Sequence, residues 1–377
     1  MALFSLAWAL LQAGFPGSRE IVDTPLYQAY GNAVLDGRVP YRDFELEYPP
    51  GALPVFILPS LGEDGQYEDL FAGLMLLCGA TAVALVAAAL AALGASSRRL
   101  YGGVALAALA PLLLGPVVLT RFDFWPAALT VGSLVSLVAG RARVGLGLLA
   151  AGVAAKIYPL VLLPLALVYV WRRRGRSEAL TALAVFALVL AAAFLPFALV
   201  APDGLLESLE RQARRPLQIE SLGAAVLLAA HRLGLYDAVV VSSHGSQNLV
   251  GALPEALATA QTAVQAVAVA GVWLLFALRT PERERLVVAS AAAVAALVAF
   301  GKVLSPQFLV WLVPLVPLAT RRAGLVAAGI LTAALVVTQL WFPSRYWDVV
   351  ALLPVSWLVL LRDVLLVALA CILVAAI

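Results

Sequence analysis

Long apolar runs separated by short polar segments repeat along almost the whole chain. A membrane-spanning helix needs about 20 predominantly apolar residues. The candidate spans cover, approximately, residues 2–15, 67–94, 100–120, 124–140, 178–200, 254–278, 323–342 and 355–377. This pattern predicts an all-α fold, a polytopic transmembrane helical bundle that forms a single domain over residues 1–377. The first run lacks a basic leader and a clear cleavage site, so we interpret it as a retained first helix.

Two further apolar regions, near 144–170 and 286–320, have basic clusters on both sides. If basic clusters are cytoplasmic, each region must enter and leave the membrane on the same side. Each half of the first region would be only about 20 Å long at 1.5 Å per residue, which is too short to cross. We therefore predict two hairpins of short helices broken by proline, buried in protein or lining a cavity.

This topology contains about 12 membrane segments and places both termini in the cytoplasm. Five arginine clusters then fall on the cytoplasmic side; they lie at residues 98–99, 141–143, 172–176, 279–285 and 321–322. The polar segments 21–50, 121–124, 201–253 and 343–354 fall outside. The segment 201–253 includes a candidate interfacial helix at 205–215, with Glu207, Glu210, Arg211, Arg214 and Arg215 interpreted as its ordinary solvated face.

Composition agrees with a membrane protein and excludes several other classes. The 377 residues are 63% hydrophobic and 12% charged, whereas soluble domains are about 25% charged. The net charge of +3 comes from short arginine clusters between apolar runs, which orient a membrane protein and give no reason to expect a nucleic-acid partner. The two cysteines and two histidines are too few and too scattered for a disulfide framework or a metal site. We expect no metal and no cofactor.

The segment 21–50, IVDTPLYQAYGNAVLDGRVPYRDFELEYPP, is a polar and aromatic island in this apolar chain. Its carboxylates are Asp23, Asp36, Asp43, Glu45 and Glu47, and its tyrosines are Tyr27, Tyr30, Tyr41 and Tyr48. Solvation alone does not require so specific a composition. We expect some of these carboxylates to take part in chemistry and the others to be solvated surface.

Ionisable residues at membrane depth are costly and indicate a functional site. Lys156 in AAKIYPLVLLP and Lys302 in GKVLSPQFLVWLVP each follow small residues and precede a proline at the predicted hairpin apices. Arg121 and Asp123 lie in TRFDFWPA, and the pair Arg362-Asp363 interrupts the last apolar run. Each has a structural alternative. The lysines would then be snorkelling side chains, Arg121 and Asp123 an ion pair at a helix junction, and Arg362-Asp363 a marker of the outer membrane boundary.

Cations near the outer face, beside an acidic loop, suit one class of reaction. Arginine and lysine in a partly desolvated cavity bind phosphate or pyrophosphate, and a nearby carboxylate suits a general base. Sugar transfer from a lipid phosphate requires both. The cations stabilise the leaving phosphate, the carboxylate takes a proton from the attacking hydroxyl, and a single displacement inverts the anomeric centre. Gln218, Glu220 and Ser221 in RPLQIESLGA are not explained by an interfacial helix.

Six motifs in order resemble those of a known family: VDTPLYQAYGNAVLDGRVPYRDFELEYPPGALP, RFDFWPA, AAKIYPLVLLP, RPLQIESLGA, GKVLSPQFLVWLVPL and LVLLRDVLL. The first is similar to the first outer loop of GT-C-fold glycosyltransferases, and the set most resembles glycosyltransferase family 87, the polyprenol-phosphate-mannose-dependent mannosyltransferases. The likeness covers nearly the whole chain. It implies a GT-C-like helical arrangement.

The resemblance also implies roles for individual residues. The family's catalytic aspartate, a few residues before a tyrosine, matches Asp23 with Tyr27 after it, and the Tyr-Pro-Pro and Ser-Pro-Gln motifs match Tyr48-Pro49-Pro50 and Ser305-Pro306-Gln307. Lys156, Lys302 and Arg362 would face the donor phosphate, to which we add Arg121. Residues expected to bind the acceptor or a sugar are Asp43, Glu45, Glu47, Tyr48, Tyr27, Gln307 and Glu220. Asp363 stands where asparagine is expected, which weakens a purely phosphate-binding role at the end of the chain.

The sequence thus predicts an inverting hexosyltransferase of the bacterial plasma membrane with an outward-facing active site. Its donor would be a polyprenyl-phosphate-linked sugar, with mannose as the default and arabinose open, and its acceptor a glycolipid or glycan. One alternative is a transporter or flippase of lipid-linked sugars, since broken helices and intramembrane cations also fit transporters. The single acidic loop on one side favours an enzyme. A second alternative, an inactive structural subunit, is disfavoured by the joint presence of Asp23, Lys156, Lys302 and Arg362.

Overall fold

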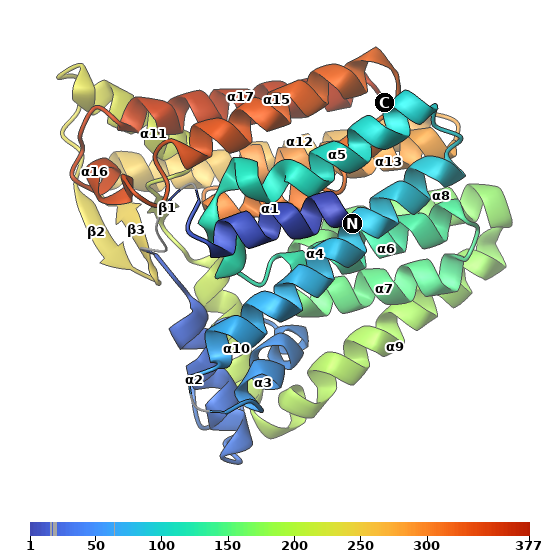
Figure 1. Cartoon of the computed structure of the whole chain (residues 1–377), viewed down its shortest axis with the longest axis horizontal. Coiled ribbons are helices and arrows are strands. Elements are labelled where there is room, and N and C mark those ends of the chain that lie inside the picture. The colour runs from blue at the N-terminus through green and yellow to red at the C-terminus, as the bar shows by residue number, and fades with distance from the viewer. Residues whose placement is uncertain (16, 18–20, 64) are drawn as a thin grey trace.

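The computed structural model describes residues 1–15, 17, 21–63 and 65–377. Long helices run side by side along one direction, and shorter elements gather at one end of them (Figure 1). The helices up to the middle of the chain are α1 (Ala2–Gln12), α2 (Thr24–Leu35), α3 (Leu53–Ser60), α4 (Tyr67–Ala92), α5 (Ser97–Leu114), α6 (Phe124–Val138), α7 (Ala142–Ala155), α8 (Leu163–Arg174), α9 (Arg176–Val200) and α10 (Pro202–Ala213). The later helices are α11 (Leu222–Arg232), α12 (Ala252–Leu278), α13 (Arg283–Ala299), α14 (Leu309–Leu312), α15 (Arg321–Gln339), α16 (Tyr346–Val350) and α17 (Ser356–Ala375).

Five of these helices, α4, α9, α12, α15 and α17, are long and apolar enough to cross a membrane. The expected count of about 12 membrane segments is not confirmed, because several other apolar helices, such as α6 and α7, have only 10–17 residues. The bundle nevertheless presents a surface suited to lipid. On α9, Leu188 is 69% exposed and Leu199 is 74% exposed. An apolar helix that leaves such side chains uncovered is stable in hydrocarbon and unfavourable in water.

Both predicted hairpins are broken at the expected positions. In the first, α7 ends at Ala155, Lys156 is extended, and a 3-10 turn over Tyr158–Leu162 leads into α8. In the second, α13 is followed by an irregular segment that contains Lys302, a 3-10 turn over Pro306–Phe308 and the single turn of α14. Proline lacks the backbone donor that a continuing helix needs, so each proline starts a new turn and leaves a lysine in non-helical backbone.

The five basic clusters lie together at one end of the bundle, as the sequence predicts. Arg172 Nη1 donates to the Arg279 carbonyl at 2.9 Å, and Arg321 pairs with Glu284 at 3.8 Å. Small surface cavities join the remaining clusters, one lined by Arg98, Arg99 and Gly324 and another by Gly140, Arg173, Arg174 and Arg283. Figure 1 shows the α8–α9 connection and the C-terminus at this end. Its assignment to the cytoplasm stays a prediction.

The opposite end carries a small antiparallel sheet, which the all-α expectation missed. Its order is β1 (Leu217–Gln218), β3 (Ser246–Leu249) and β2 (Val240–Ser243) (Figure 1). His244 and Gly245, with φ of 53° and 67°, form the two-residue turn between β2 and β3. Positive φ at both central residues matches the twist of a hairpin. The strands are too short and too polar to have given a period-two hydrophobic signal.

Candidate functional site

A cavity of about 460 Å³ opens at this end of the bundle, where segments far apart in the sequence meet. Ligand sites in proteins usually have volumes of this order. Its polar and charged lining comes from Asp23, Glu47, Tyr48, Arg121, Lys156, Tyr158, Gln212, Arg215, Gln218, Glu220, Ser246, Ser305, Gln307 and Tyr346. Three acids and three bases therefore share one cavity. The cavity lies at the end away from the five basic clusters.

Asp23 precedes α2 and uses its carboxylate in an ion pair. An aspartate at this position usually accepts hydrogen bonds from the first turn of the helix, but here Oδ1 lies 2.9 Å from Arg121 Nη1 and makes no cap. The Tyr27 hydroxyl donates to Oδ2 at 3.3 Å, and the Tyr27 ring stacks on Phe56 at 4.5 Å between centroids. The Asp23 side chain stays 29% exposed. The carboxylate is therefore oriented from behind and remains open to the cavity.

A second ion pair lies beside the first. Asp123 begins α6 and accepts hydrogen bonds from Lys156 Nζ at 2.7 Å and Trp311 Nε1 at 2.6 Å. The ammonium also lies 4.7 Å from the Phe122 ring centroid, which adds a cation–π attraction. Arg121 and Asp123 thus pair with distant residues rather than with each other. Lys156 is held over an aromatic floor and is not a snorkelling side chain.

The Pro49-Pro50-Gly51 segment packs the loop that carries Tyr48 against α6 and the end of α7. The Trp125 indole nitrogen donates to the Gly51 carbonyl at 3.0 Å. A Cβ on Gly51 would lie 2.5 Å from the Ala154 carbonyl carbon, so only glycine allows this approach to the end of α7. The Tyr-Pro-Pro-Gly motif therefore fixes the distance between Tyr48 on the loop and Lys156, the residue that follows α7.

Glu220 is a buried carboxylate in the cavity wall. Its side chain accepts a hydrogen bond from Gln218 Nε2, which also donates to Ser305 Oγ at 3.1 Å. Behind it, Arg362 on α17 is fully buried, donates to the Glu220 carbonyl at 2.6 Å and pairs with Asp363 at 2.6 Å. Arg362 and Asp363 are 0% exposed, so they form a pair inside the protein and not at its surface. Burial raises the pKa of Glu220 to about 7, against the opposing effect of Arg362.

This raised pKa gives a testable pH dependence. In the folded state Glu220 keeps its proton to a higher pH than in the unfolded state, so stability falls as pH rises from about 4.5 to 7 and then levels off. A difference of this size corresponds to roughly 3 kcal/mol. Glu220→Gln is expected to remove most of this slope. Thermal unfolding of both proteins in detergent between pH 5 and 8 tests it, and parallel curves would contradict it.

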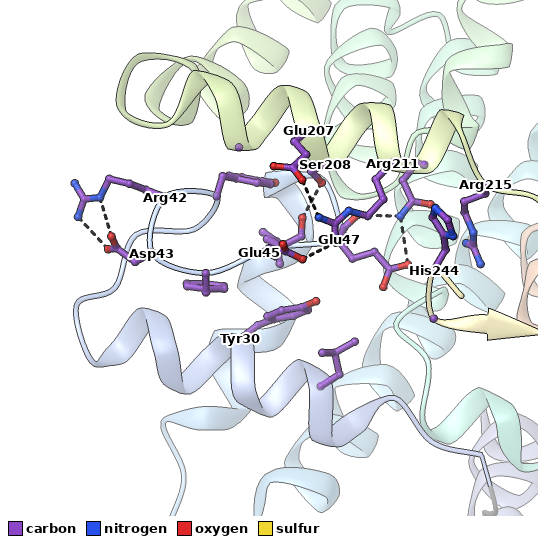
Figure 2. A pocket seen from close by; sticks show the side chains of 17 residues that line it. Tyr30, Arg42, Asp43, Glu45, Glu47, Glu207, Ser208, Arg211, Arg215 and His244 are labelled. Atoms are coloured by element: carbon purple, nitrogen blue, oxygen red, sulfur yellow. Dashed lines mark hydrogen bonds and ion pairs between the residues drawn. The ribbon is translucent and has the colours of Figure 1, made fainter. Parts of the chain in front are cut away.

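A second cavity of about 780 Å³ adjoins the first. Both cavities share the side chains of Leu26, Glu47, Gln212 and Arg215. Figure 2 shows Tyr30 on α2 pointing into it, with Arg42 and Asp43 at one end and Arg215 and His244 at the other. Within it Arg42 pairs with Asp43 at 2.9 Å, and Arg211 pairs with Glu45 at 2.5 Å and Glu207 at 3.1 Å. The wall combines tyrosine rings with charged hydrogen-bonding groups.

Comparison with known proteins gives one match. A sequence model of glycosyltransferase family 87 matches residues 46–306, more than half of the chain. The chain belongs to glycosyltransferase family 87. A search of curated proteins found no match. Asp23 lies before the matched range and Arg362 after it. The role suggested for Asp23 therefore rests on its place in the first cavity and on the resemblance of its motif, and the role suggested for Arg362 rests on the resemblance of its motif.

This family 87 member brings together most, but not all, of the residues singled out from the sequence. Those that line the first cavity are Asp23, Arg121, Lys156, Glu47, Tyr48, Gln307 and Glu220. Asp43 and Glu45 line the adjoining cavity, and Tyr27 is buried behind Asp23. Two donor-phosphate candidates do not line either cavity. Lys302 donates to the Ala213 carbonyl at 2.9 Å at the end of α10, and Arg362 lies behind Glu220.

Sequence reasoning missed the contribution of α10 and the sheet. Glu207, Arg211 and Arg215 were interpreted as an ordinary solvated face, yet all three line a cavity. The α10 pattern alone does not reveal this, because the partner surface is the loop over 41–47, far away in the sequence. Among residues 1–15, 17, 21–63 and 65–377 no group of three or more His, Cys, Asp or Glu side chains could hold a metal ion.

Proposed function

We propose that this family 87 glycosyltransferase is an inverting enzyme that moves a sugar, mannose by default, from a polyprenyl-phosphate donor to a glycolipid or glycan. The reaction takes place at the outer face of a bacterial plasma membrane. The observation that carries the proposal is the first cavity, where an accessible carboxylate, Asp23, lies in the same wall as Arg121 and Lys156. Family membership supports sugar transfer over transport.

In the proposed reaction Asp23 is the general base. It removes the proton from an acceptor hydroxyl as the hydroxyl oxygen forms a bond to the anomeric carbon. The bond from that carbon to the phosphate oxygen breaks, and the lipid phosphate leaves with the electron pair. One displacement of this kind inverts the anomeric configuration. Arg121 fixes the carboxylate from one side at 2.9 Å and leaves it exposed to the cavity on the other.

In the proposed reaction the cations of the first cavity stabilise the negative charge that develops on the leaving phosphate. Preorganised positive charge beside a developing oxyanion is worth more inside a cavity than in water. Lys156 is held in place by Asp123 and Trp311, so it needs little reorganisation when a phosphate arrives. The donor's lipid tail would remain in the hydrocarbon region of the bilayer, which the exposed apolar faces of the long helices define.

The adjoining cavity suits the acceptor in this proposal. Sugar rings bind to surfaces that combine aromatic faces with planar charged groups, and Tyr30, Glu45, Glu47 and Arg211 supply both. Since the two cavities meet at Glu47 and Arg215, an acceptor hydroxyl can reach Asp23 from the larger cavity. Gln307 and Glu220 line the smaller cavity, and we expect them to contact the sugar being transferred.

We expect purified protein in lipid to transfer label from polyprenyl-phosphate-mannose to a lipid in an extract of bacterial envelope lipids. The product should carry the opposite anomeric configuration to the donor. Thin-layer chromatography with mass spectrometry detects it, and boiled protein is the control. Turnover of an arabinose donor instead would change the sugar, whereas movement of intact donor across vesicles without a product would favour a flippase.

A further inference from the structure

The charged residues of the first cavity are not equivalent. Arg121 is paired with Asp23 at 2.9 Å, and Lys156 is paired with Asp123 at 2.7 Å. The third cation, Arg215, forms no ion pair with any residue in the described part of the chain. Glu47 and Glu220 line the same cavity, but neither carboxylate lies within ion-pair distance of Arg215. Arg215 is therefore the cation of this cavity that has no carboxylate in direct contact, and its charge acts on Glu220 only at longer range.

The position of Arg215 is fixed without using up its donors. It lies between the end of α10 and the start of β1, and Nη2 donates to Ser246 Oγ at 3.0 Å on β3. Its Nε is buried and has no hydrogen-bond partner among the described residues. A guanidinium has five N–H donors in a rigid fork, and leaving a buried donor unpaired costs about 1–3 kcal/mol. A ligand that accepts from this fork would remove that cost.

We propose that Arg215 binds the phosphate of the lipid-linked donor and holds it as the leaving group. This inference rests on the proposed function. Arg215 lines both cavities, and Figure 2 shows it beside His244 at one end of the larger cavity. The forked guanidinium matches the planar pair of oxygens that a phosphate presents.

The donor phosphate is favoured over an anionic acceptor because of the charge around each cavity. The larger cavity has four carboxylates, Asp43, Glu45, Glu47 and Glu207, against the three arginines Arg42, Arg211 and Arg215, whereas the smaller cavity has three acids and three bases, so the larger one is the less favourable of the two for an anion. In the smaller cavity the two ion pairs leave little net positive charge for a dianion. Arg215 supplies the missing charge at the boundary, so the phosphate would lie on the side of Asp23, where the reacting carbon must also be.

The test uses the full-length protein in nanodiscs with Arg215→Ala, Arg215→Lys and the control Arg214→Ala. Arg214 is the neighbouring residue, pairs with Glu210 at 3.0 Å and lines neither cavity. The probes are a short-chain polyprenyl monophosphate and the corresponding uncharged polyprenol. We expect wild type to prefer the phosphate. Arg215→Ala should weaken phosphate binding about 10- to 100-fold, leave polyprenol binding unchanged, and be partly rescued by lysine. Arg214→Ala should match wild type.

The outcomes separate the two proposals. If wild type prefers the phosphate and Arg215→Ala binds it equally well, the role of Arg215 is wrong while the proposed function stands. If wild type does not distinguish phosphate from polyprenol, the donor class itself is wrong and the inference falls with it. The last measurement compares the binding of inorganic phosphate and of a phosphate-bearing glycolipid. If Arg215→Ala weakens binding of the glycolipid alone, the assignment of Arg215 to the donor phosphate is wrong. Thermal unfolding of Arg215→Ala and Arg215→Lys establishes that folded proteins were tested.

Discussion

Replacing Asp23 with asparagine is expected to lower kcat by about 10²- to 10⁴-fold, the usual contribution of a general base. Asparagine keeps the shape of the side chain and one oxygen that can accept from Arg121, but it loses the charge of that ion pair and the second acceptor used by the Tyr27 hydroxyl, and the amide cannot accept a proton. The Asp23 carboxylate is oriented by those two residues and is still 29% exposed to the cavity. Donor binding should change much less than turnover, because the base acts in the transition state.

The matched control is Asp36→Asn at the other end of α2. Asp36 follows the last residue of the helix, is exposed and lines neither cavity. Initial rates with a labelled donor, together with thermal unfolding of each variant, separate a chemical effect from a folding defect. A folded Asp23→Asn protein with wild-type turnover would exclude Asp23 as the base, and Glu47 would then be the next candidate in the same cavity.

The sequence predicted those parts of the fold that depend on local patterns. The broken hairpins follow from a lysine and a proline within apolar runs, and both occur where expected. The helix near 205–215 and the gathering of the arginine clusters also follow from local composition. The membrane count of about 12 is not confirmed, because helices such as α6 and α7 are shorter than the apolar runs around them suggested.

The residue types of the candidate site were predictable from the sequence, but the ion pairs that these residues form were not. Arg121 and Asp123 are two residues apart, which suggested an ion pair between them, yet each selects a partner from a distant segment. Arg362 carries the charge expected of a phosphate ligand, but packing of α17 against α11 places it behind the Glu220 backbone. Arg215 escaped notice because its cavity wall is completed by the β2–β3 hairpin, whose short strands give no clear sequence signal.

Asp123→Ala is expected to destabilise the protein by about 3–5 kcal/mol, the range for removing one partner of a buried ion pair. Asp123 is 1% exposed and accepts hydrogen bonds from both Lys156 and Trp311. Its loss leaves an ammonium in an aromatic environment with no counter-charge and an indole donor without a partner. The activity should fall as well, because Lys156 would no longer be held at the cavity wall.

Two comparisons make this test specific. Glu178→Ala removes a partner from an exposed pair, Arg143–Glu178 at 2.9 Å near the basic end, and should hardly change the melting temperature. Lys156→Met in the Asp123→Ala background removes the uncompensated charge and should restore part of the stability but none of the activity. Denaturant titrations in mixed micelles measure the stability of each variant, and donor turnover measures its activity. If the Asp123→Ala and Glu178→Ala proteins have the same melting temperature, the buried Lys156–Asp123 pair does not stabilise this wall of the cavity.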